Sequence, residues 1–175
     1  YYVPDLWEQF LESKMYGTGF KKQTSIQILH EKHRIKIRPD FIFEKEETPY
    51  MILDAKFKPM WLDFHKLKKI PFEKIGDDYD ECVRYMRVIG GVSTGVIFPY
   101  LDIPENKSVD ENPKRFTTSK YNSEDSFYTI PIKIPCIEQN ESYSAWRKRF
   151  DENVEMVIEP TKKIIELEKE YYFCK

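Results

Sequence analysis

The strongest constraint on the fold is a pair of segments in which apolar and polar residues alternate, joined by a short polar link. The first segment, at 33–43, reads HRIKIRPDFIF, and the second, at 50–57, reads YMILDAKF, with EKEETP between them. Alternation with a period of two predicts β-strands, and the short link predicts an antiparallel hairpin. Three charged residues, Asp40, Asp54 and Lys56, interrupt these apolar segments and need an explanation.

The alternation places these charged residues on one surface of the hairpin. Asp54 and Lys56 are two residues apart and share a face, and Asp40 lies opposite the face of Phe41. Mg²⁺ is bound in proteins through one or two carboxylates and keeps several waters. Asp40 and Asp54, with the Ala55 carbonyl, would make such a partial shell. Lys56 would then orient or deprotonate an attacking water, or stabilise charge on a phosphate.

Each motif alone also has a structural explanation. A Pro-Asp pair before an apolar strand is common in turns, and an Asp-x-Lys on a strand often forms a surface ion pair. Their order along the chain is more specific: a helix with an internal Glu, a hairpin, Pro-Asp, and then apolar-apolar-Asp-x-Lys. The combination favours metal-dependent hydrolysis of a phosphodiester.

The remaining pattern predicts helices and strands in alternation. A helix is predicted at 5–15, with Asp5 as N-cap and Glu8 completing a capping box. The other predicted elements are a strand at 24–30, a short helix within the loop after Lys58, a helix at 77–88 ended by Gly90-Gly91, a buried central strand at 92–100, a long surface loop at 102–126, an edge strand at 127–137, and a C-terminal helical segment broken near Pro160.

Composition narrows the class of protein. The 175 residues are 41% hydrophobic and 33% charged, which suffices for one sizeable core. A net charge of −2 argues against a general basic coat for nucleic acid. Three widely spaced cysteines without a C-x-x-C pair predict neither disulfides nor structural zinc, so we expect a reducing, cytoplasmic setting. No apolar run reaches the roughly 18 residues of a membrane span, and no signal-peptide pattern is present.

The segment RPDFIFEKEETPYMILDAKFK, at 38–58, resembles the PD-(D/E)xK nuclease signature. RPDF followed by ILDAKFK is similar to the McrC family and its relatives among modification-dependent and type II restriction nucleases. The opening YYVPDLWEQFLESKM is similar to the helix that begins that domain, and TGVIFPY to its later buried strand. The resemblance covers roughly residues 1–100.

The resemblance implies a restriction-endonuclease-like α/β fold, with a central mixed β-sheet flanked by α-helices. We expect a single nuclease domain at 1–175, with its core at about 1–137 and a C-terminal helical segment at 141–172. Because the chain starts with Tyr1, it can be part of a longer chain. The implied activity is cleavage of DNA with Mg²⁺, for which Mn²⁺ is expected to substitute.

Carried over residue by residue, the motif assigns its first acid to Asp40, its second to Asp54 and its lysine to Lys56. Glu8 matches the acid that many relatives carry on the first helix, where it touches the metal directly or through water. The implied metal ligands are therefore Asp40, Asp54, Ala55 and Glu8. The capping box remains the alternative role for Glu8.

One departure from the family concerns the helix after the lysine strand. Many relatives carry a Q-x-x-x-Y pair there, and the segment DDYDECVRYM offers Asp80 and Arg84 at that spacing. Arg84 can reach a phosphate with Asp80 as its partner. An exposed helix ion pair is the alternative explanation.

A basic stretch follows the predicted catalytic strand and is the candidate DNA-contacting surface. Contacts to phosphates position a substrate without reading its sequence. The residues proposed for these contacts, together with Arg84, are Lys58, His65, Lys66, Lys68 and Lys69. A flexible basic loop without DNA contacts is the alternative.

The leading hypothesis is a Mg²⁺-dependent DNA endonuclease of restriction or defence, the cleavage subunit or domain of an McrBC-like modification-dependent system. Its expected partners are DNA, an McrB-like AAA+ motor and, on DNA, a second copy; no membrane is involved. Two alternatives remain open: a nuclease of repair, transposition or RNA processing on the same fold, and a catalytically silent module that binds nucleic acid or protein.

Overall fold

The computed structural model describes residues 3–15, 20–22, 26–30, 33–45, 48–68, 71–91, 93–117 and 126–173. Over these residues the strands form a six-stranded sheet in the order β1-β4-β5-β6-β8-β7, and a separate hairpin of β2 and β3. The strands are β1 (Phe20–Lys22), β2 (Ile26–His30), β3 (His33–Ile37), β4 (Phe41–Lys45), β5 (Thr48–Ala55), β6 (Ser93–Leu101), β7 (Lys114–Thr117) and β8 (Ser126–Ile134). The helices are α1 (Val3–Met15), α2 (Met60–His65), α3 (Gly76–Ile89) and α4 (Tyr143–Phe173), with short 3₁₀ turns at Phe72–Lys74 and Pro104–Asn106.

The sheet is mixed because its connections are of two kinds. A short link joins β4 to β5 as an antiparallel hairpin, whereas β5, β6 and β8 are parallel and need longer connections. The connection from β5 to β6 contains α2 and α3. The central strand β6 is buried along most of its length, as the apolar run at 92–100 predicts.

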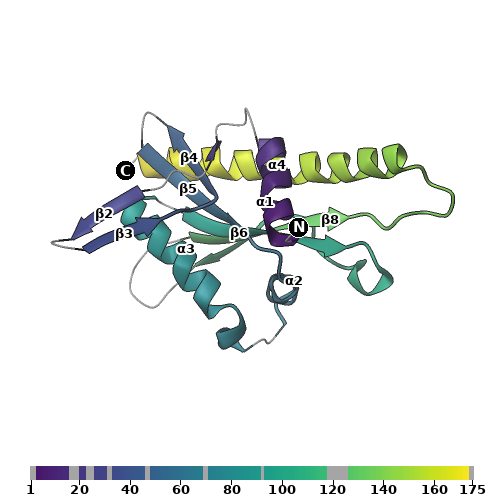
Figure 1. The fold of residues 1–175 in the computed structure, drawn as a ribbon, viewed down its shortest axis with the longest axis horizontal. Helices are drawn as coiled ribbons and strands as arrows, with labels where there is room; N and C mark the ends of the chain where they lie inside the picture. Colours follow the sequence, from purple (N-terminus) through teal and green to yellow (C-terminus); the bar gives the residue numbers. More distant parts are fainter. Residues whose placement is uncertain are drawn as a thin grey trace.

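Helices cover the two faces of the sheet, with α1 and α4 on one side and α2 and α3 on the other (Figure 1). On the first side, Trp7 and Leu11 of α1 and Val154 of α4 pack with apolar residues of β4, β5, β6 and β8. On the second side, Trp61 of α2 and Met86 of α3 belong to two further apolar clusters. The predicted α/β fold with a mixed sheet flanked by helices is confirmed, and it is consistent with a restriction-endonuclease-like core.

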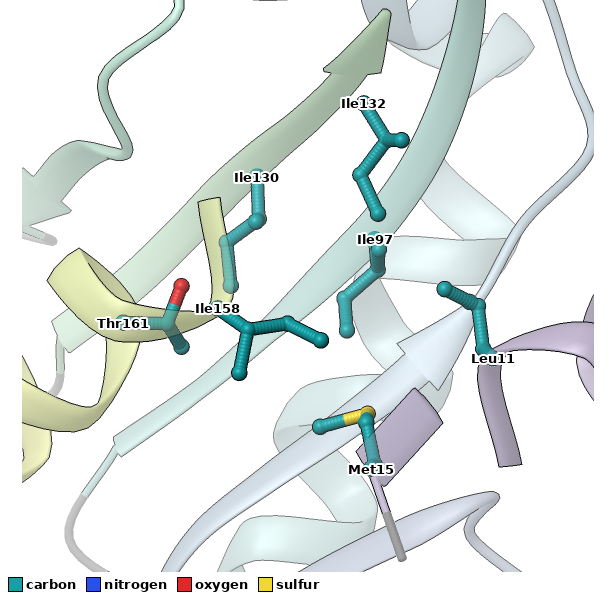
Figure 2. Close-up of a pocket in the computed structure, with 7 residues that line it drawn as sticks. All are labelled: Leu11, Met15, Ile97, Ile130, Ile132, Ile158 and Thr161. Carbon is teal, nitrogen blue, oxygen red and sulfur yellow. The ribbon is translucent and has the colours of Figure 1, made fainter. Parts of the chain in front are cut away.

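A small cavity marks where α1 and α4 meet above the sheet, and Figure 2 shows the side chains that converge on it. Its volume is about 10 Å³, and its walls are Leu11, Met15, Ile97, Ile130, Ile132, Ile158 and Thr161. A space this small and apolar belongs to the packing and has no room for a ligand. The packing holds α1 against the sheet, and α1 carries Glu8 one turn before Leu11.

The predicted strand at 33–43 is in fact two strands separated by a break. β3 ends at Ile37, β4 begins at Phe41, and the three residues between them, Arg38 to Asp40, are not in a strand. Pro39 lacks the N–H that would continue a ladder, which explains the break. Asp40 therefore lies at the entrance to β4 and is not in the middle of a strand.

Two predictions for the segment at 102–137 are also corrected. The segment at 102–126 is not only a loop, because it contains β7, which pairs with β8. β8 therefore lies between β6 and β7 and is not an edge strand. Pro131 is tolerated in β8 because β7 pairs with Ser126 to Thr129 and ends before Pro131. No hydrogen bond to β7 is therefore required from the missing N–H of Pro131.

The C-terminal helix is longer than the pattern suggested. The predicted break near Pro160 is absent, since α4 continues through it to Phe173. Proline removes one backbone donor, and the other hydrogen bonds of a long helix can maintain it. Within the described part of the chain, α4 included, we find no helix both long and apolar enough to cross a membrane.

The close contact of β6 with β8 yields a stability prediction. Gly95 pairs with Tyr128, and a Cβ at position 95 would lie 2.4 Å from the Tyr128 carbonyl oxygen. Backbone atoms of a central strand cannot move aside cheaply, so we expect Gly95→Ala to lower the free energy of unfolding by about 1–3 kcal/mol or more. Urea unfolding measures this loss.

Gly91→Ala is the matched control. A Cβ there would meet the far end of the Ile52 side chain, at 3.0 Å, which can shift more easily. A loss as large for Gly91→Ala as for Gly95→Ala would contradict the explanation based on the strand contact.

Candidate active site

The two predicted acids meet at the end of β5. In the β4–β5 ladder Phe41 pairs with Leu53, so the next step along the ladder brings Asp40 opposite Asp54. The Ala55 N–H donates a hydrogen bond of 2.7 Å to Asp40 Oδ2. The Asp40 carboxylate is thereby held over the last residue of β5, next to Asp54.

Asp54 is a buried carboxylate with few compensating contacts. Its side chain points toward α3, and the residue is 4% exposed. Its Oδ2 atom is in ionic contact with the Lys56 ammonium but accepts no hydrogen bond of normal geometry from the described residues. Burial raises the pKa of Asp54, the negative charge of Asp40 raises it further, and Lys56 opposes both. Two neighbouring carboxylates of this kind would be stabilised by a cation.

Lys56 links the end of β5 to α3. Its Nζ donates a hydrogen bond of 3.0 Å to Glu81 Oε2 and contacts Asp54. Burial lowers the pKa of Lys56, but the two carboxylates outweigh burial and hold that pKa above its ordinary value. Lys56 is therefore an ammonium at neutral pH.

Two residues of α3 complete this network, and the sequence reasoning missed both. The Tyr85 hydroxyl donates a hydrogen bond of 2.7 Å to Glu81 Oε1. Burial alone would raise the pKa of Glu81, but the bonds from Tyr85 and Lys56 bring it below its ordinary value. Glu81 is therefore a carboxylate fixed on both of its oxygens.

Two pairs of residues on α3 have the Q-x-x-x-Y spacing. Asp80 and Arg84 are exposed, and the Arg84 guanidinium lies 5.9 Å from the centre of the Tyr85 ring. Glu81 and Tyr85 have the same spacing one residue later, and Tyr85 matches the tyrosine of that pattern. Tyr85 could therefore have identified the pair Glu81 and Tyr85 from the sequence.

A second acid of α3, Asp78, is fixed beside this network. Asp78 Oδ1 accepts a hydrogen bond of 2.7 Å from Lys58 Nζ, and Asp78 Oδ2 accepts one of 3.1 Å from the Trp61 indole N–H. Lys56 Nζ lies 3.7 Å from Asp78 Oδ1. Lys58 is thereby placed next to Lys56.

Glu8 approaches the site from α1. The helix begins at Val3, so Asp5 lies inside its first turn and is not the N-cap, and the capping box is wrong. Burial raises the pKa of Glu8, Arg38 opposes the shift, and Asp54 adds to it. Glu8 therefore lies within electrostatic range of Asp54.

The carboxylates do not form a closed metal cage. Across the described residues, no group of three Asp, Glu, His or Cys side chains is close enough to hold an ion. Glu8, Asp40 and Asp54 are therefore not close enough together in this structure to form such a group. The donors available at the end of β5 are two carboxylates and the Ala55 carbonyl, which in an extended strand points to the same side as the Ala55 N–H bonded to Asp40. This is a donor set that suits Mg²⁺ with waters.

The predicted DNA-contacting residues are placed in different ways. Lys58 and Arg84 adjoin the network through Asp78 and Tyr85. Lys66 instead donates to Asn106 Oδ1 at 2.7 Å, and Lys68 pairs with Asp63 at 2.7 Å. Lys69 lies outside the described residues.

His65 is not part of a DNA-facing surface, contrary to the prediction, because it is 0% exposed. Its Nε2 lies 2.7 Å from the Asp110 carbonyl oxygen, and its Nδ1 lies 2.8 Å from Thr129 Oγ1. A carbonyl only accepts, so Nε2 carries the proton and Nδ1 accepts from the Thr129 hydroxyl. His65 therefore connects α2 to β8 and to the segment before β7.

No protein-family model matches the chain, and no curated protein matches it. Among solved structures, the chain is similar to a chain in the complex of Thermococcus gammatolerans McrB AAA+ hexamers with bound McrC, with a TM-score of 0.48 and 15% sequence identity. The match covers 88% of the present chain and 33% of that chain, so the present chain spans about a third of its length. The function is therefore inferred from the residues of the site.

The buried His65 yields a prediction about pH. Burial lowers the pKa of His65 although the bond to Asp110 opposes the shift, so the unfolded chain binds a proton more readily than the folded one. The contribution of neutral His65 is complete above the unfolded pKa of about 6.5 and is lost as pH falls toward the folded pKa. We expect the free energy of unfolding to fall less steeply from about pH 7.5 to about pH 5.5 in His65→Gln than in the parent.

Thr129→Val is the control, measured by urea unfolding at the same pH values. It removes one partner of the imidazole but keeps the titrating group, so it should lower stability and retain most of the pH slope. An equally steep slope in His65→Gln and the parent would exclude His65 as its source.

Proposed function

We propose that the chain is a Mg²⁺-dependent DNA endonuclease domain of the PD-(D/E)xK type, which hydrolyses phosphodiester bonds. One observation carries the proposal: Asp40 is bonded to the Ala55 N–H beside the buried Asp54, and the Lys56 ammonium contacts Asp54 Oδ2. A metal cation would stabilise this pair of carboxylates. The Lys56 ammonium lies next to the pair, where its positive charge would stabilise the negative charge that develops on a phosphate.

The carboxylates of Asp40 and Asp54 and the carbonyl of Ala55 would hold Mg²⁺, with Mn²⁺ as a substitute, and Glu8 would support the shell through water. The bound ion supplies Lewis acidity and lowers the pKa of a bound water. The charges of the site fit this assignment. Asp54 and Glu81 contact the Lys56 ammonium and Asp40 adds a further carboxylate at the end of β5, so carboxylates outnumber the ammonium and a divalent ion would offset the excess.

Lys56 stabilises the charge that develops on the phosphate. An amine that keeps its proton does not serve as a general base at neutral pH, so charge stabilisation is favoured over deprotonation of the water. Lys58 and Arg84, which adjoin the network, would contact the DNA backbone and position the substrate.

The proposed setting is defence against foreign DNA, as the cleavage subunit or domain of an McrBC-like modification-dependent restriction system. The support is the resemblance of RPDF and ILDAKFK to the McrC family. An McrB-like AAA+ motor would supply the recognition of modified DNA. One site of this kind cuts one strand, so cleavage of both strands requires two copies, and we propose a dimer on DNA.

The decisive test of this function is nicking of supercoiled plasmid, modified and unmodified, with Mg²⁺ or Mn²⁺. We expect Asp54→Asn and Lys56→Met each to lower the nicking rate by roughly 10²–10³-fold, because each removes a charge that acts on the reacting phosphate or its metal. The matched controls are Asp63→Asn and Lys148→Met, which change the same residue types in exposed ion pairs outside the site. Equal activity in all four variants and the parent would place the nuclease activity elsewhere or in a contaminant.

Metal binding can be tested without DNA. At a Mg²⁺ concentration about 100 times the dissociation constant, the parent should gain about 2.7 kcal/mol of unfolding free energy. Asp54→Asn should gain much less, whereas Asp63→Asn should gain as much as the parent. Denaturant unfolding with and without Mg²⁺ measures the gain, and an equal gain in Asp54→Asn would show that the ion binds at another place.

A further inference from the structure

The side chain of Lys56 is held between two carboxylates that come from different parts of the fold. Asp54 precedes it on β5, and Glu81 reaches it from α3 across the face of the sheet. The Lys56 side chain is 17% exposed, so most of its length is enclosed. A lysine has many rotamers in solution, and two acceptors on different elements restrict it to one.

Glu81 is itself fixed by Tyr85, which also packs in an apolar cluster between α3 and the sheet. Tyr85 lies one helical turn further along α3, is buried, and donates its hydroxyl proton to Glu81 Oε1 at 2.7 Å. The other oxygen, Oε2, accepts from Lys56 at 3.0 Å. The order of contacts is thus Tyr85, Glu81, Lys56 and Asp54.

The two acceptors of Lys56 differ in what else they are expected to do. Asp54 is a proposed metal ligand, so its charge is shared with the cation. Glu81 belongs to no proposed ligand set and keeps its full charge for Lys56. The neighbouring acid Asp78 is occupied by Lys58 and Trp61, and it lies further from Lys56, at 3.7 Å.

We propose that Glu81 is the positioning residue of Lys56 and that Tyr85 orients Glu81 for this task. The inference rests on the proposed nuclease function, because the position that matters is that of the ammonium relative to the scissile phosphate. Glu81 keeps Lys56 directed into the site when Asp54 binds the cation. A charged carboxylate makes this hold stronger than a neutral acceptor would.

The kinetic test compares Glu81→Gln, Glu81→Ala and Tyr85→Phe with the parent in plasmid nicking. We expect kcat to fall by roughly tenfold to a hundredfold in Glu81→Gln, as for loss of one charge-assisted hydrogen bond, and further in Glu81→Ala. KM and the Mg²⁺ concentration at half-maximal rate should stay near the parent values. Tyr85→Phe should show a smaller loss of the same kind.

Two further variants separate positioning from a general effect on α3. Asp80→Asn removes a carboxylate at the adjacent, exposed position, and it should keep the parent kcat. The double variant Glu81→Gln with Lys56→Met should be no slower than Lys56→Met alone, because a residue that acts only through Lys56 has no effect once Lys56 is gone. Additive losses in the double variant would overturn the proposal.

A second readout needs neither metal nor DNA. In metal-free protein, the rate of Lys56 acetylation by acetic anhydride, followed by mass spectrometry, should rise about tenfold in Glu81→Gln, as expected when one charged hydrogen bond is lost. The exposed Lys68 in the same sample serves as the internal reference.

The outcomes distinguish the two proposals. If the parent nicks DNA and Glu81→Gln has an unchanged kcat, the positioning role is overturned and the nuclease function stands. If the parent nicks no DNA under any condition, the nuclease function and the catalytic task of Glu81 fall together, and the acetylation rate still decides whether Glu81 holds Lys56. A faster Lys56 acetylation together with a non-additive loss of kcat supports the positioning role.

Discussion

A carboxylate can be buried only if its charge is compensated, and the surroundings of Asp54 follow from this requirement. Asp54 lies at the end of a central strand with Asp40 beside it, so two carboxyl groups gather where solvent is largely excluded. The Lys56 ammonium contacts Asp54, and Glu81 of α3 contacts the same ammonium. Burial and Asp40 raise the pKa of Asp54, Lys56 opposes this shift, and a bound cation would oppose it further.

The architecture of the sheet makes such a cluster possible. The antiparallel β4–β5 pair brings Asp40 to the end of β5, and the Ala55 N–H left at that end holds it there. The parallel β5–β6 pair requires a long connection, and that connection supplies α2 and α3. Acids from α3 then face the lysines that leave β5. The same strand end thus receives charged groups from a hairpin partner, from its own continuation and from a helix above it.

Much of the fold and part of the site were predictable from the sequence, because they depend on short-range patterns. The period of two assigned Ile52 and Asp54 to one face of β5 and Met51 and Leu53 to the other, and the apolar clusters agree. The role of Pro39 in ending a strand was not recognised, although proline chemistry is local. The pairing of β7 with β8 was not predictable, since four residues in a polar segment carry too weak a pattern to reveal a strand.

The sequence by itself determined the elements of the domain and the proximity of Asp54, Ala55 and Lys56, since local periodicity and chain connectivity suffice for both. Only the tertiary structure decided that Glu81 and Tyr85, and not Asp80 and Arg84, face Lys56. Neighbouring positions on a helix differ by about 100° in direction, and which one faces the sheet depends on how the whole helix packs. The tertiary structure also decided that His65 is buried whereas Lys68 is exposed. Burial depends on contacts between segments that are distant in the sequence.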